Sequence, residues 1–213
     1  MKILELFAGS RSVGNVADQF NFEVFSVDWK NYDKINLVCD IENLKISDLP
    51  FIPDIIWASP DCTTYSISAI STHRNGIEPK TDYAKKCDQV NKHFIALIQD
   101  LLLINPDLKF YIENPRGMFR KMPFIQNFKR NTIWYCQYGD NRAKPTDIFT
   151  NDNNWVPRKV CCNGNPNCNH ERAPRGSKTG TQKLKNSYER SRIPKQLIIE
   201  ILNLNYEKHK HGI

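Results

Sequence analysis

Hydrophobic and polar positions alternate along the chain in short blocks that predict strands and helices in turn. Apolar runs typical of buried strands occur at residues 2–7, 23–28, 37–41, 54–58, 108–112, 132–138 and 147–150. Apolar residues at helical spacing occur at 12–20, 84–104 and 194–206. This alternation predicts an α/β fold with a doubly wound, mostly parallel sheet, in which ligands bind beyond the carboxyl ends of the strands.

Two stretches interrupt the alternation. Residues 63–80 are polar without clear periodicity and predict a loop, whereas residues 153–182 are rich in Asn, Pro, Gly, Cys and Arg and predict an inserted module. We therefore expect a main domain at 1–152, a small basic module at 153–187, and a C-terminal helix at 188–213 that returns to the main domain.

Composition narrows the class of protein. The chain has 213 residues, of which 40% are hydrophobic, and no apolar run approaches the ~20 residues that span a membrane. Its first residues enter a strand pattern without a cleavable apolar segment, so we expect a cytoplasmic protein without a membrane partner, and a monomer.

The net charge is +7, and basic residues concentrate after Arg158. This asymmetry favours a phosphate-bearing partner; the alternative is a solvated tail that aids solubility.

Seven cysteines are spread along the chain, an odd number that favours reduced thiols over a disulfide framework. Cys161, Cys162, Cys168 and His170 lie close together in the module and supply the kinds of ligand that bind tetrahedral zinc. Side chains of neighbouring residues diverge, so Cys161 and Cys162 need a tight turn to share one metal. The alternative is a cysteine-containing loop without metal.

The end of the first predicted strand carries features of a nucleoside-binding site. The chain continues FAGSRSVG, in which Gly9 and Gly14 flank a strand-to-helix turn. Such a turn lets backbone approach a ligand closely, although plain turns share the pattern. Asp28 ends the second strand about 20 residues beyond, where a carboxylate suits ribose hydroxyls. Trp29 either stacks on an adenine or fills the core, and Asp40 either accepts a bond from an adenine amino group or caps a turn.

Five motifs occur in the order used by the DNA cytosine-5 methyltransferases: LELFAGSRSVG, the strand that ends in Asp28, ASPDC, YIENPRG and QYGDNRAKPTDIFTN. RSRIPKQLIIEIL is similar to the closing region of compact, phage-like members. The chain resembles this family over residues 1–150 and 188–204. The resemblance implies a Rossmann-like methyltransferase sheet, S-adenosylmethionine as cofactor of the main, catalytic domain, DNA as partner, and a role such as restriction–modification. It also adds Phe7 and Pro60 to the cofactor-binding residues.

The same resemblance implies a mechanism. Carbon 5 of cytosine is too weak a nucleophile to take a methyl group until a thiolate adds to carbon 6. The family takes that thiolate from a Pro-x-Cys cysteine, here Cys62, for which the alternative is a buried structural thiol. The Glu-Asn glutamate, here Glu113, protonates or hydrogen-bonds ring nitrogen 3, and its alternative is a solvated charge at a strand end. Asn114 holds the loop, and solvent removes the proton from carbon 5.

The chain departs from the family pattern at several positions. A Gln-x-Arg-x-Arg stretch of the family corresponds to Arg142, Lys144 and Thr146 here. Lys144 keeps the positive charge of the first arginine but not its planar guanidinium group. We assign Lys144 to the catalytic residues, together with Cys62 and Glu113. The other departures are Arg11 in place of a second glycine, Asp61 in place of a second proline, and Pro115 after the Glu-Asn pair.

Basic residues complete the predicted contacts with DNA. Arg142, Arg172, Arg175 and Lys178 are expected to grip phosphates rather than read bases. The target base must be flipped out, because carbon 6 is inaccessible within a duplex. Two alternatives stay open: the same chemistry on RNA, and a catalytically weak nucleic-acid-binding decoy built on the same fold. The departures at Arg11 and in the Arg-x-Arg pair favour the decoy, whereas the intact nucleophile and acid oppose it.

Overall fold

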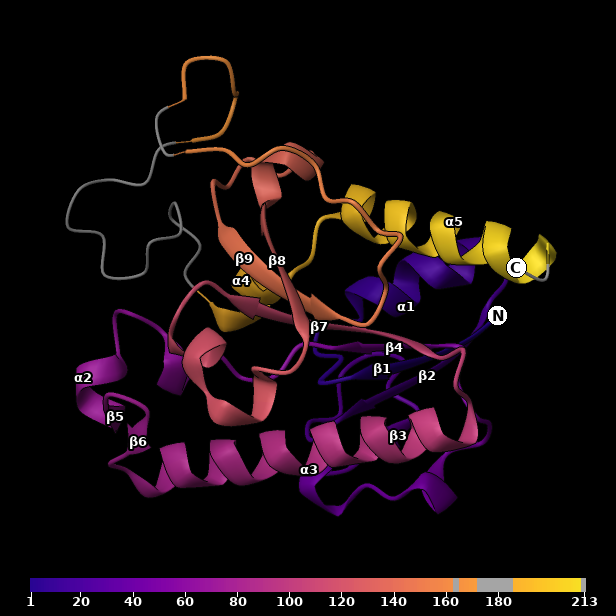
Figure 1. Ribbon diagram of the computed structural model, residues 1–213, viewed down its shortest axis with the longest axis horizontal. Coiled ribbons are helices and arrows are strands. Elements are labelled where there is room, and N and C mark those ends of the chain that lie inside the picture. The colour runs from indigo at the N-terminus through magenta and orange to yellow at the C-terminus, as the bar shows by residue number, and fades with distance from the viewer. Residues whose placement is uncertain (163–164, 172–185, 212–213) are drawn as a thin grey trace.

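A computed structural model describes residues 1–162, 165–171 and 186–211, and within them seven strands form one sheet (Figure 1). The strands are β1 (Lys2–Leu6), β2 (Glu23–Asp28), β3 (Leu37–Val38), β4 (Ile55–Ala58), β7 (Lys109–Pro115), β8 (Lys129–Trp134) and β9 (Pro145–Thr150). Their order across the sheet is β3-β2-β1-β4-β7-β9-β8. Neighbours from β3 to β7 run parallel, and β9 runs antiparallel to both β7 and β8. The doubly wound, mostly parallel sheet expected from the sequence is therefore confirmed.

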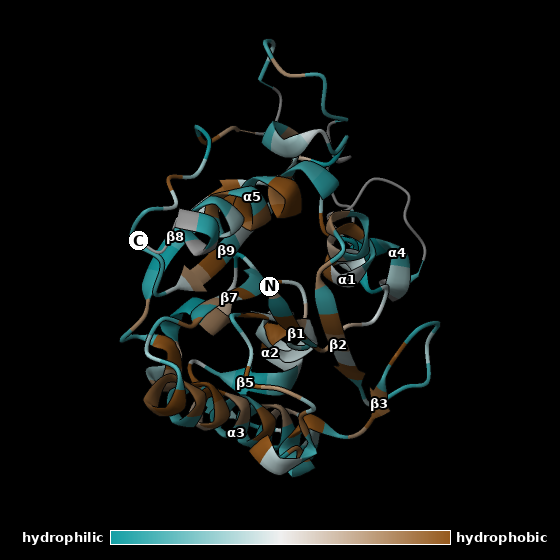
Figure 2. Cartoon of the chain, turned by 90° about the vertical axis from the view of Figure 1, so that its right-hand side faces the viewer, coloured by the Kyte–Doolittle hydropathy of each residue, from teal (hydrophilic) through white to brown (hydrophobic). Residues whose placement is uncertain are grey.

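Helices cover both faces of the sheet. The helices α1 (Ser12–Ala17) and α5 (Lys195–His211) pack on one face, and α3 (Asp82–Ile104) packs on the other (Figure 1). Figure 2 shows hydrophobic residues along α3 and α5, which lie on opposite sides of the strands. Because alternate residues of a strand point to opposite faces, Leu4 joins the core beneath α3 and Ile3 joins the core beneath α1 and α5.

The remaining elements are short. They are the helices α2 (Ile70–His73) and α4 (Ser187–Ser191), the hairpin strands β5 (Arg74–Asn75) and β6 (Glu78–Pro79), and the 3₁₀ turns η1 (Asp18–Phe20), η2 (Ile41–Asn43), η3 (Ile46–Asp48), η4 (Thr63–Tyr65), η5 (Met118–Lys121), η6 (Pro123–Ile125) and η7 (Tyr135–Tyr138). Within the described ranges, no helix combines the length and the apolar character that crossing a membrane requires.

The ends of the elements differ from the sequence expectation by a few residues. Helix α3 starts at Asp82, because the Thr81 side chain accepts a hydrogen bond from the Ala84 N–H at 3.2 Å and caps the helix. Strand β7 runs past residue 112, since its end pairs with β9 up to Pro115 and Thr146. This extension places the end of the YIENPRG motif within the sheet, next to β9.

The expectation of a loop at 63–80 is wrong: the segment contains η4, α2 and the β5–β6 hairpin. Arg74 is buried and pairs with Asp88 of α3 at 2.6 Å. The Tyr65 hydroxyl donates to the same carboxylate at 2.6 Å, and the Arg74 guanidinium lies 4.1 Å from the centre of the Tyr65 ring. A buried ion pair gives no periodic signal in a sequence, yet here it fixes the segment that follows residue 62 onto α3.

The segment that follows β9 begins in the core rather than on the surface. Trp155 is buried beneath α5, and its indole N–H donates to Glu200 of that helix at 3.2 Å. Further along, the Glu171 N–H donates to the Asn141 carbonyl at 2.8 Å, and Glu171 forms a parallel bridge with Arg142. The described part of the module therefore lies against the turn between β8 and β9. Its extent as a separate unit stays a prediction.

Candidate active site

Cys62 lies just beyond the carboxyl end of β4, where the chain enters η4. The preceding loop is tied to β7, because the Asn114 side chain donates from Nδ2 to the Pro60 carbonyl at 3.1 Å. Asn114 is buried, and its Oδ1 has no hydrogen-bond partner among the described residues. A buried acceptor of this kind suits a ligand that donates a hydrogen bond. The parallel strands β4 and β7 thus present Cys62 and Glu113 at the same edge of the sheet.

The charge state of Cys62 depends on its neighbours. Loss of hydration raises the pKa of this partly buried thiol to about 11, although the nearby Lys144 ammonium lowers that pKa. Negative charge on Glu113 or Asp61 raises the same pKa. Cys62 is therefore a neutral thiol at pH 7 in this structure. Removing negative charge beside it, or adding positive charge, favours the nucleophilic thiolate.

Glu113 is a buried carboxyl group near the end of β7. Its Oε1 accepts a hydrogen bond from the Tyr135 hydroxyl at 2.7 Å and lies 3.6 Å from Lys144 Nζ. Burial raises the pKa of Tyr135 well above its usual value, so the phenol stays protonated and acts as a donor. Sequence reasoning missed this role, because Tyr135 falls in an apolar run and resembles any other core aromatic residue.

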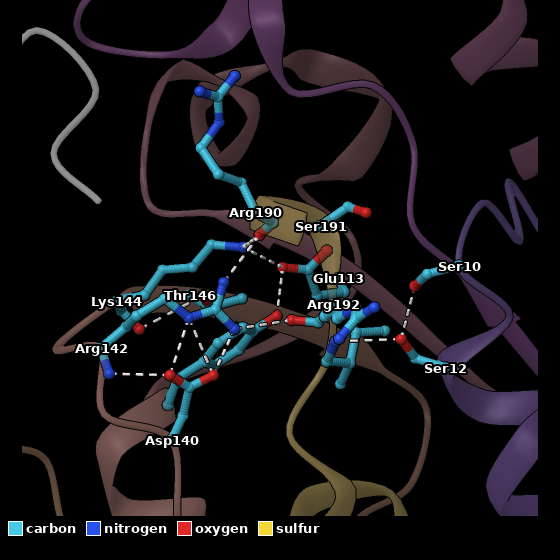
Figure 3. Close-up of polar contacts among 12 residues, drawn as sticks. Ser10, Ser12, Glu113, Asp140, Arg142, Lys144, Thr146, Arg190, Ser191 and Arg192 are labelled. Carbon is cyan, nitrogen blue, oxygen red and sulfur yellow. Dashed lines mark hydrogen bonds and ion pairs between the residues drawn. The ribbon is translucent and has the colours of Figure 1, made fainter. Parts of the chain in front are cut away.

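The Lys144 side chain points into the site (Figure 3). Its amino group lies 4.6 Å from the centre of the Tyr135 ring and 3.4 Å from the Arg190 carbonyl oxygen. Only 12% of the side chain is exposed. The structure therefore brings Lys144 together with Cys62 and Glu113, the other two residues that the sequence assigns to catalysis. A thiol, a carboxyl group and an ammonium group share one partly buried location.

The assignment of Arg142 to DNA contact is corrected by its surroundings. The residue is 5% exposed, and its guanidinium pairs with Asp140. It also donates to the carbonyl oxygens of Arg190 and Arg192 at 3.1 and 3.0 Å (Figure 3). Arg142 therefore ties the turn between β8 and β9 to the chain at α4, and its charge is compensated inside the protein. The other predicted DNA contacts, Arg172, Arg175 and Lys178, lie outside the described residues.

Asp28 ends β2 as a buried carboxylate. Its Oδ2 accepts a bond from the Gly9 N–H and its Oδ1 accepts one from the Lys30 N–H, both at 2.9 Å. Each oxygen retains a further lone pair, so ribose hydroxyls can still bind. Gly9 and Phe7 have positive φ angles of 48° and 55°, and the loop after β1 turns back towards the end of β2. These features fit the ribose of a nucleoside cofactor such as S-adenosylmethionine.

The two residues assigned to adenine have different surroundings. The Trp29 side chain is 65% exposed, so the alternative in which it fills the core is wrong. It remains available for stacking on a base, with the Lys30 ammonium 4.4 Å from its ring centre. Asp40 caps η2 by accepting a bond from the Glu42 N–H at 3.1 Å, and it lies 3.2 Å from Lys86 Nζ. The structure therefore shows the capping role that was the alternative for Asp40.

Gly14 allows close packing between α1 and β1, and its assignment to the cofactor stays a prediction. A Cβ added to Gly14 would lie 2.8 Å from Glu5 Oε2, and the Gly14 N–H donates to that oxygen at 3.1 Å. Burial raises the pKa of Glu5 to about 7, although hydrogen bonds from Val13, Ser26 and Gly14 lower it. Sequence reasoning missed Glu5, although a carboxylate in the middle of the apolar run 2–7 is a signal.

The outer side of the turn after β1 borders a hollow. Arg11 adopts a φ of 53°, a region that favours glycine, and its guanidinium folds back onto Asp18 at 2.6 Å. The turn therefore keeps its conformation despite the missing glycine. A hollow of about 220 Å³ lies beside it, lined by Ser10, Ser12 and Asn15 from the turn and α1 and by Tyr188, Arg192 and Lys195 from the C-terminal segment.

A cluster of cysteine and histidine side chains lies where the module meets η7. The potential ligand atoms of Cys136, Cys161, Cys168 and His170 all lie within 4.8 Å of one another. Cys162, which the sequence placed in this set, is exposed and lies outside the cluster. Side chains of adjacent residues point in different directions, and Cys136 of η7 completes the set instead. Cys136 falls in a predicted strand far from the other ligands, so their spacing gave no indication of it.

The sheet order, the turn after β1 and the acidic end of β2 define a Rossmann-like methyltransferase fold. A candidate DNA modification methyltransferase encoded within an E. coli prophage matches with a TM-score of 0.50 at 15% identity. The Entamoeba histolytica methyltransferase EhMeth matches with a TM-score of 0.52 at 15% identity. Both matches cover 76% of this chain, but 52% and 57% of those chains, so the chain spans about half their length.

Sequence comparison extends the similarity over nearly the whole chain. No family model matches the sequence. A protein of Frog virus 3 (isolate Goorha), named "Probable DNA (cytosine-5)-methyltransferase", is 28% identical over 223 residues, which cover 96% of this chain and 100% of the viral protein. The resemblance to DNA cytosine-5 methyltransferases expected from the motifs is therefore confirmed. The aligned region also reaches into the module that lies outside those motifs.

Proposed function

We propose that this protein transfers the methyl group of S-adenosylmethionine to carbon 5 of cytosine in DNA through a covalent adduct with Cys62. One observation carries the proposal: Cys62, Glu113 and Lys144 meet at the carboxyl ends of β4 and β7, close enough that both charges alter the pKa of the thiol. The similarity to the Frog virus 3 protein along its entire length supports DNA as the substrate.

Residues around the ends of β1 and β2 would hold the cofactor. The lone pairs that Asp28 retains would accept bonds from the ribose hydroxyls, and the exposed Trp29 ring would stack on the adenine. The backbone of Phe7 and Gly9, with its positive φ angles, leaves room for close approach. When bound, S-adenosylmethionine supplies an electrophilic methyl group on a positively charged sulfur.

Cys62 provides the nucleophile. Its Sγ gives its proton to water and bonds to carbon 6 of the ring, and the electron pair of the carbon 5–carbon 6 double bond moves onto carbon 5 and makes it nucleophilic. Lys144 favours this step, because its positive charge lowers the pKa of Cys62. After methylation, water takes the proton from carbon 5, the ring double bond forms again, the thiolate leaves, and the proton on nitrogen 3 returns to Glu113.

Glu113 acts on ring nitrogen 3. Tyr135 donates to Oε1, so Oε2 is the oxygen left to hold the proton that is shared with nitrogen 3. A proton on Glu113 also removes the negative charge that raises the pKa of Cys62, and thus couples the acid to the nucleophile. When Glu113 gives up its proton, the Lys144 ammonium 3.6 Å from Oε1 compensates the new charge.

Lys144 replaces one of the two arginines that the family pattern carries. The compact Lys144 ammonium faces both Glu113 and the Arg190 carbonyl. It lacks the planar guanidinium of an arginine, which could form two parallel hydrogen bonds to a further group. Thr146 is buried and brings no second charge. We infer a site that keeps the chemistry of base activation with fewer contacts to the flipped-out base.

The test is to trap the covalent adduct. Fluorine at carbon 5 prevents loss of a proton there, so duplexes containing 5-fluorocytosine, incubated with S-adenosylmethionine, should give an adduct that survives denaturation. Cys62→Ser should give none, whereas Cys162→Ser, which changes an exposed cysteine outside the site, should trap like the wild type. An adduct at another cysteine would refute the assignment. Trapping on RNA but not DNA would move the activity to RNA, and tight DNA binding without any adduct would support the decoy.

A further inference from the structure

The Cys/His cluster contains ligands from two parts of the chain. Cys161, Cys168 and His170 come from the module, and Cys136 comes from η7, which follows β8 directly. Cys161 Sγ lies 3.8 Å from His170 Nδ1, and all four ligand atoms lie within 4.8 Å of one another. Within the described chain every cysteine is a free thiol. A single disulfide bond would join only two of the three cysteines and would leave the third as a free thiol.

The spacing of these atoms is close to what tetrahedral zinc requires. Zinc binds sulfur at about 2.3 Å and imidazole nitrogen at about 2.0 Å, so ligand atoms at tetrahedral angles lie roughly 3.6–3.8 Å apart. The sulfur–nitrogen distance of 3.8 Å is already near this value. The widest separation needs a contraction of no more than about 1 Å to reach it, which side-chain rotation can supply.

Amide groups around the cluster donate to its sulfur atoms. The Gln137 side chain places Nε2 3.8 Å from Cys136 Sγ and 3.6 Å from Cys168 Sγ. The Asn165 side chain places Nδ2 3.4 Å from Cys161 Sγ. All three sulfur atoms therefore have an N–H donor, which is how the groups surrounding a metal site support thiolate ligands. These amide contacts are an observation independent of the spacing of the ligands themselves.

We propose that Cys136, Cys161, Cys168 and His170 bind one zinc ion that fastens the module to η7. Three thiolates and one imidazole make a closed set without an open position, which is typical of a structural site rather than a catalytic one. Soft sulfur ligands also select zinc over magnesium or calcium. The site is separate from the proposed reaction, so zinc content and methyl transfer can be measured independently.

The position of the site gives it a consequence for the active site. Cys136 directly follows Tyr135, whose hydroxyl donates to Glu113. On the other side of His170, the Glu171 N–H bonds to the Asn141 carbonyl at 2.8 Å in the turn between β8 and β9. Zinc bound to Cys136 would therefore hold the segment that carries Tyr135 to the module. The Glu171 hydrogen bond attaches the module a second time, to the turn between β8 and β9. The metal holds structure in place and touches no substrate.

Elemental analysis of protein purified without chelators tests the ligand set. The wild type should contain about one zinc per chain. Cys136→Ser should lose most of it, whereas Cys162→Ser is the matched control, since it changes a neighbouring exposed cysteine outside the cluster, and should keep it. A wild type without zinc overturns the proposal. Full zinc content in Cys136→Ser also overturns it, whether or not Cys162→Ser keeps its zinc.

A second measurement covers the case in which Cys136→Ser fails to fold. Cobalt replaces zinc in the wild type and should show the visible absorption of a tetrahedral thiolate site. His170→Cys should retain metal and strengthen the sulfur-to-cobalt charge-transfer band, because a fourth thiolate joins the set, while His170→Ala should weaken cobalt binding. An octahedral spectrum in the wild type, or an unchanged charge-transfer band in His170→Cys, would rule out this ligand set.

Discussion

The Tyr135 hydroxyl donates a 2.7 Å hydrogen bond to Glu113 Oε1, and both groups are buried. The two residues come from neighbouring parts of the sheet, since Glu113 lies near the end of β7 and Tyr135 follows β8. The Tyr135 hydroxyl fixes Oε1 of the buried carboxyl group and leaves Oε2 free to hydrogen-bond to a substrate. This arrangement explains how a single carboxyl group can be oriented towards a base.

Tyr135→Phe should therefore impair turnover more than substrate binding. Loss of the hydrogen bond frees Glu113 to rotate, and we expect kcat to fall about tenfold, the equivalent of a net hydrogen bond of about 1.4 kcal/mol, with a small change in KM. Tyr138→Phe is the matched control, because that hydroxyl accepts a bond from the Arg158 N–H at 2.9 Å outside the site. Equal losses of kcat in both variants would assign the effect to general stability.

Lys144→Ala should shift the ionisation of Cys62 to higher pH. Burial already raises the pKa of this thiol to about 11, and Lys144 lowers that pKa, so removing the ammonium raises it further. The rate at which iodoacetamide labels Cys62, followed by mass spectrometry across pH, should fall at every pH below the transition. Lys144→Arg should preserve most of the rate. Identical profiles for the wild type and Lys144→Ala would show that the two groups do not interact.

Glu5 should make the protein less stable as pH rises towards neutrality. Burial raises the pKa of Glu5 from 4.5 to about 7 in the folded state, so the folded state binds its proton more tightly than the unfolded chain does. The stabilisation is complete below pH 4.5 and is lost as pH rises through 7. The free energy of unfolding should fall by about 3 kcal/mol over this range, against a flatter profile in Glu5→Gln. Urea titrations at each pH provide the measurement, and parallel profiles would contradict the assignment.

Asp28→Ala should weaken the binding of S-adenosylhomocysteine several-fold or more. The substitution removes the acceptors for the ribose hydroxyls, at a cost of about 1–3 kcal/mol, and also frees the Gly9 and Lys30 amides. Asp54→Ala is the control, since Asp54 accepts a bond from the Lys2 N–H at the opposite end of the sheet. Titration calorimetry decides between them, and unchanged affinity in Asp28→Ala would remove Asp28 from the site.

The sequence predicts the central strands well because their burial on both faces leaves a plain signal. The apolar runs at 54–58 and 108–112 mark β4 and β7. Cys62 follows β4 and Glu113 lies near the end of β7, on the side of the sheet where parallel strands bind ligands. Periodicity fails where a single buried charge determines the structure. Arg74 and Asp88 order a polar segment that has no repeat, and Glu5 holds α1 through contacts that no pattern records.

The Cys/His cluster shows a different limit of sequence reasoning. Spacing groups ligands that are neighbours in the chain, so it placed Cys161 and Cys162 together. The fold separates them and brings in Cys136 from η7, because η7 and the module meet in space. Arg142 departs from expectation for a related reason: a basic residue in a loop is expected to face solvent, whereas here Arg142 is buried against Asp140 and backbone carbonyls.

The antiparallel direction of β9 determines which residue can reach the acid. A parallel strand would bring its last residues to the edge where Glu113 lies, but β9 brings its first, so Lys144 arrives there from the preceding turn. The Tyr135 N–H bonds to the Lys144 carbonyl at 3.1 Å and fixes this register. Because alternate residues face opposite sides, inserting one residue between Lys144 and Pro145 would turn the lysine away from Glu113 and leave the sheet intact. An insertion of two residues in the same place should restore the direction of the side chain but displace it by about 6–7 Å along the strand, so the parity and the length of this turn together decide whether the ammonium reaches the acid.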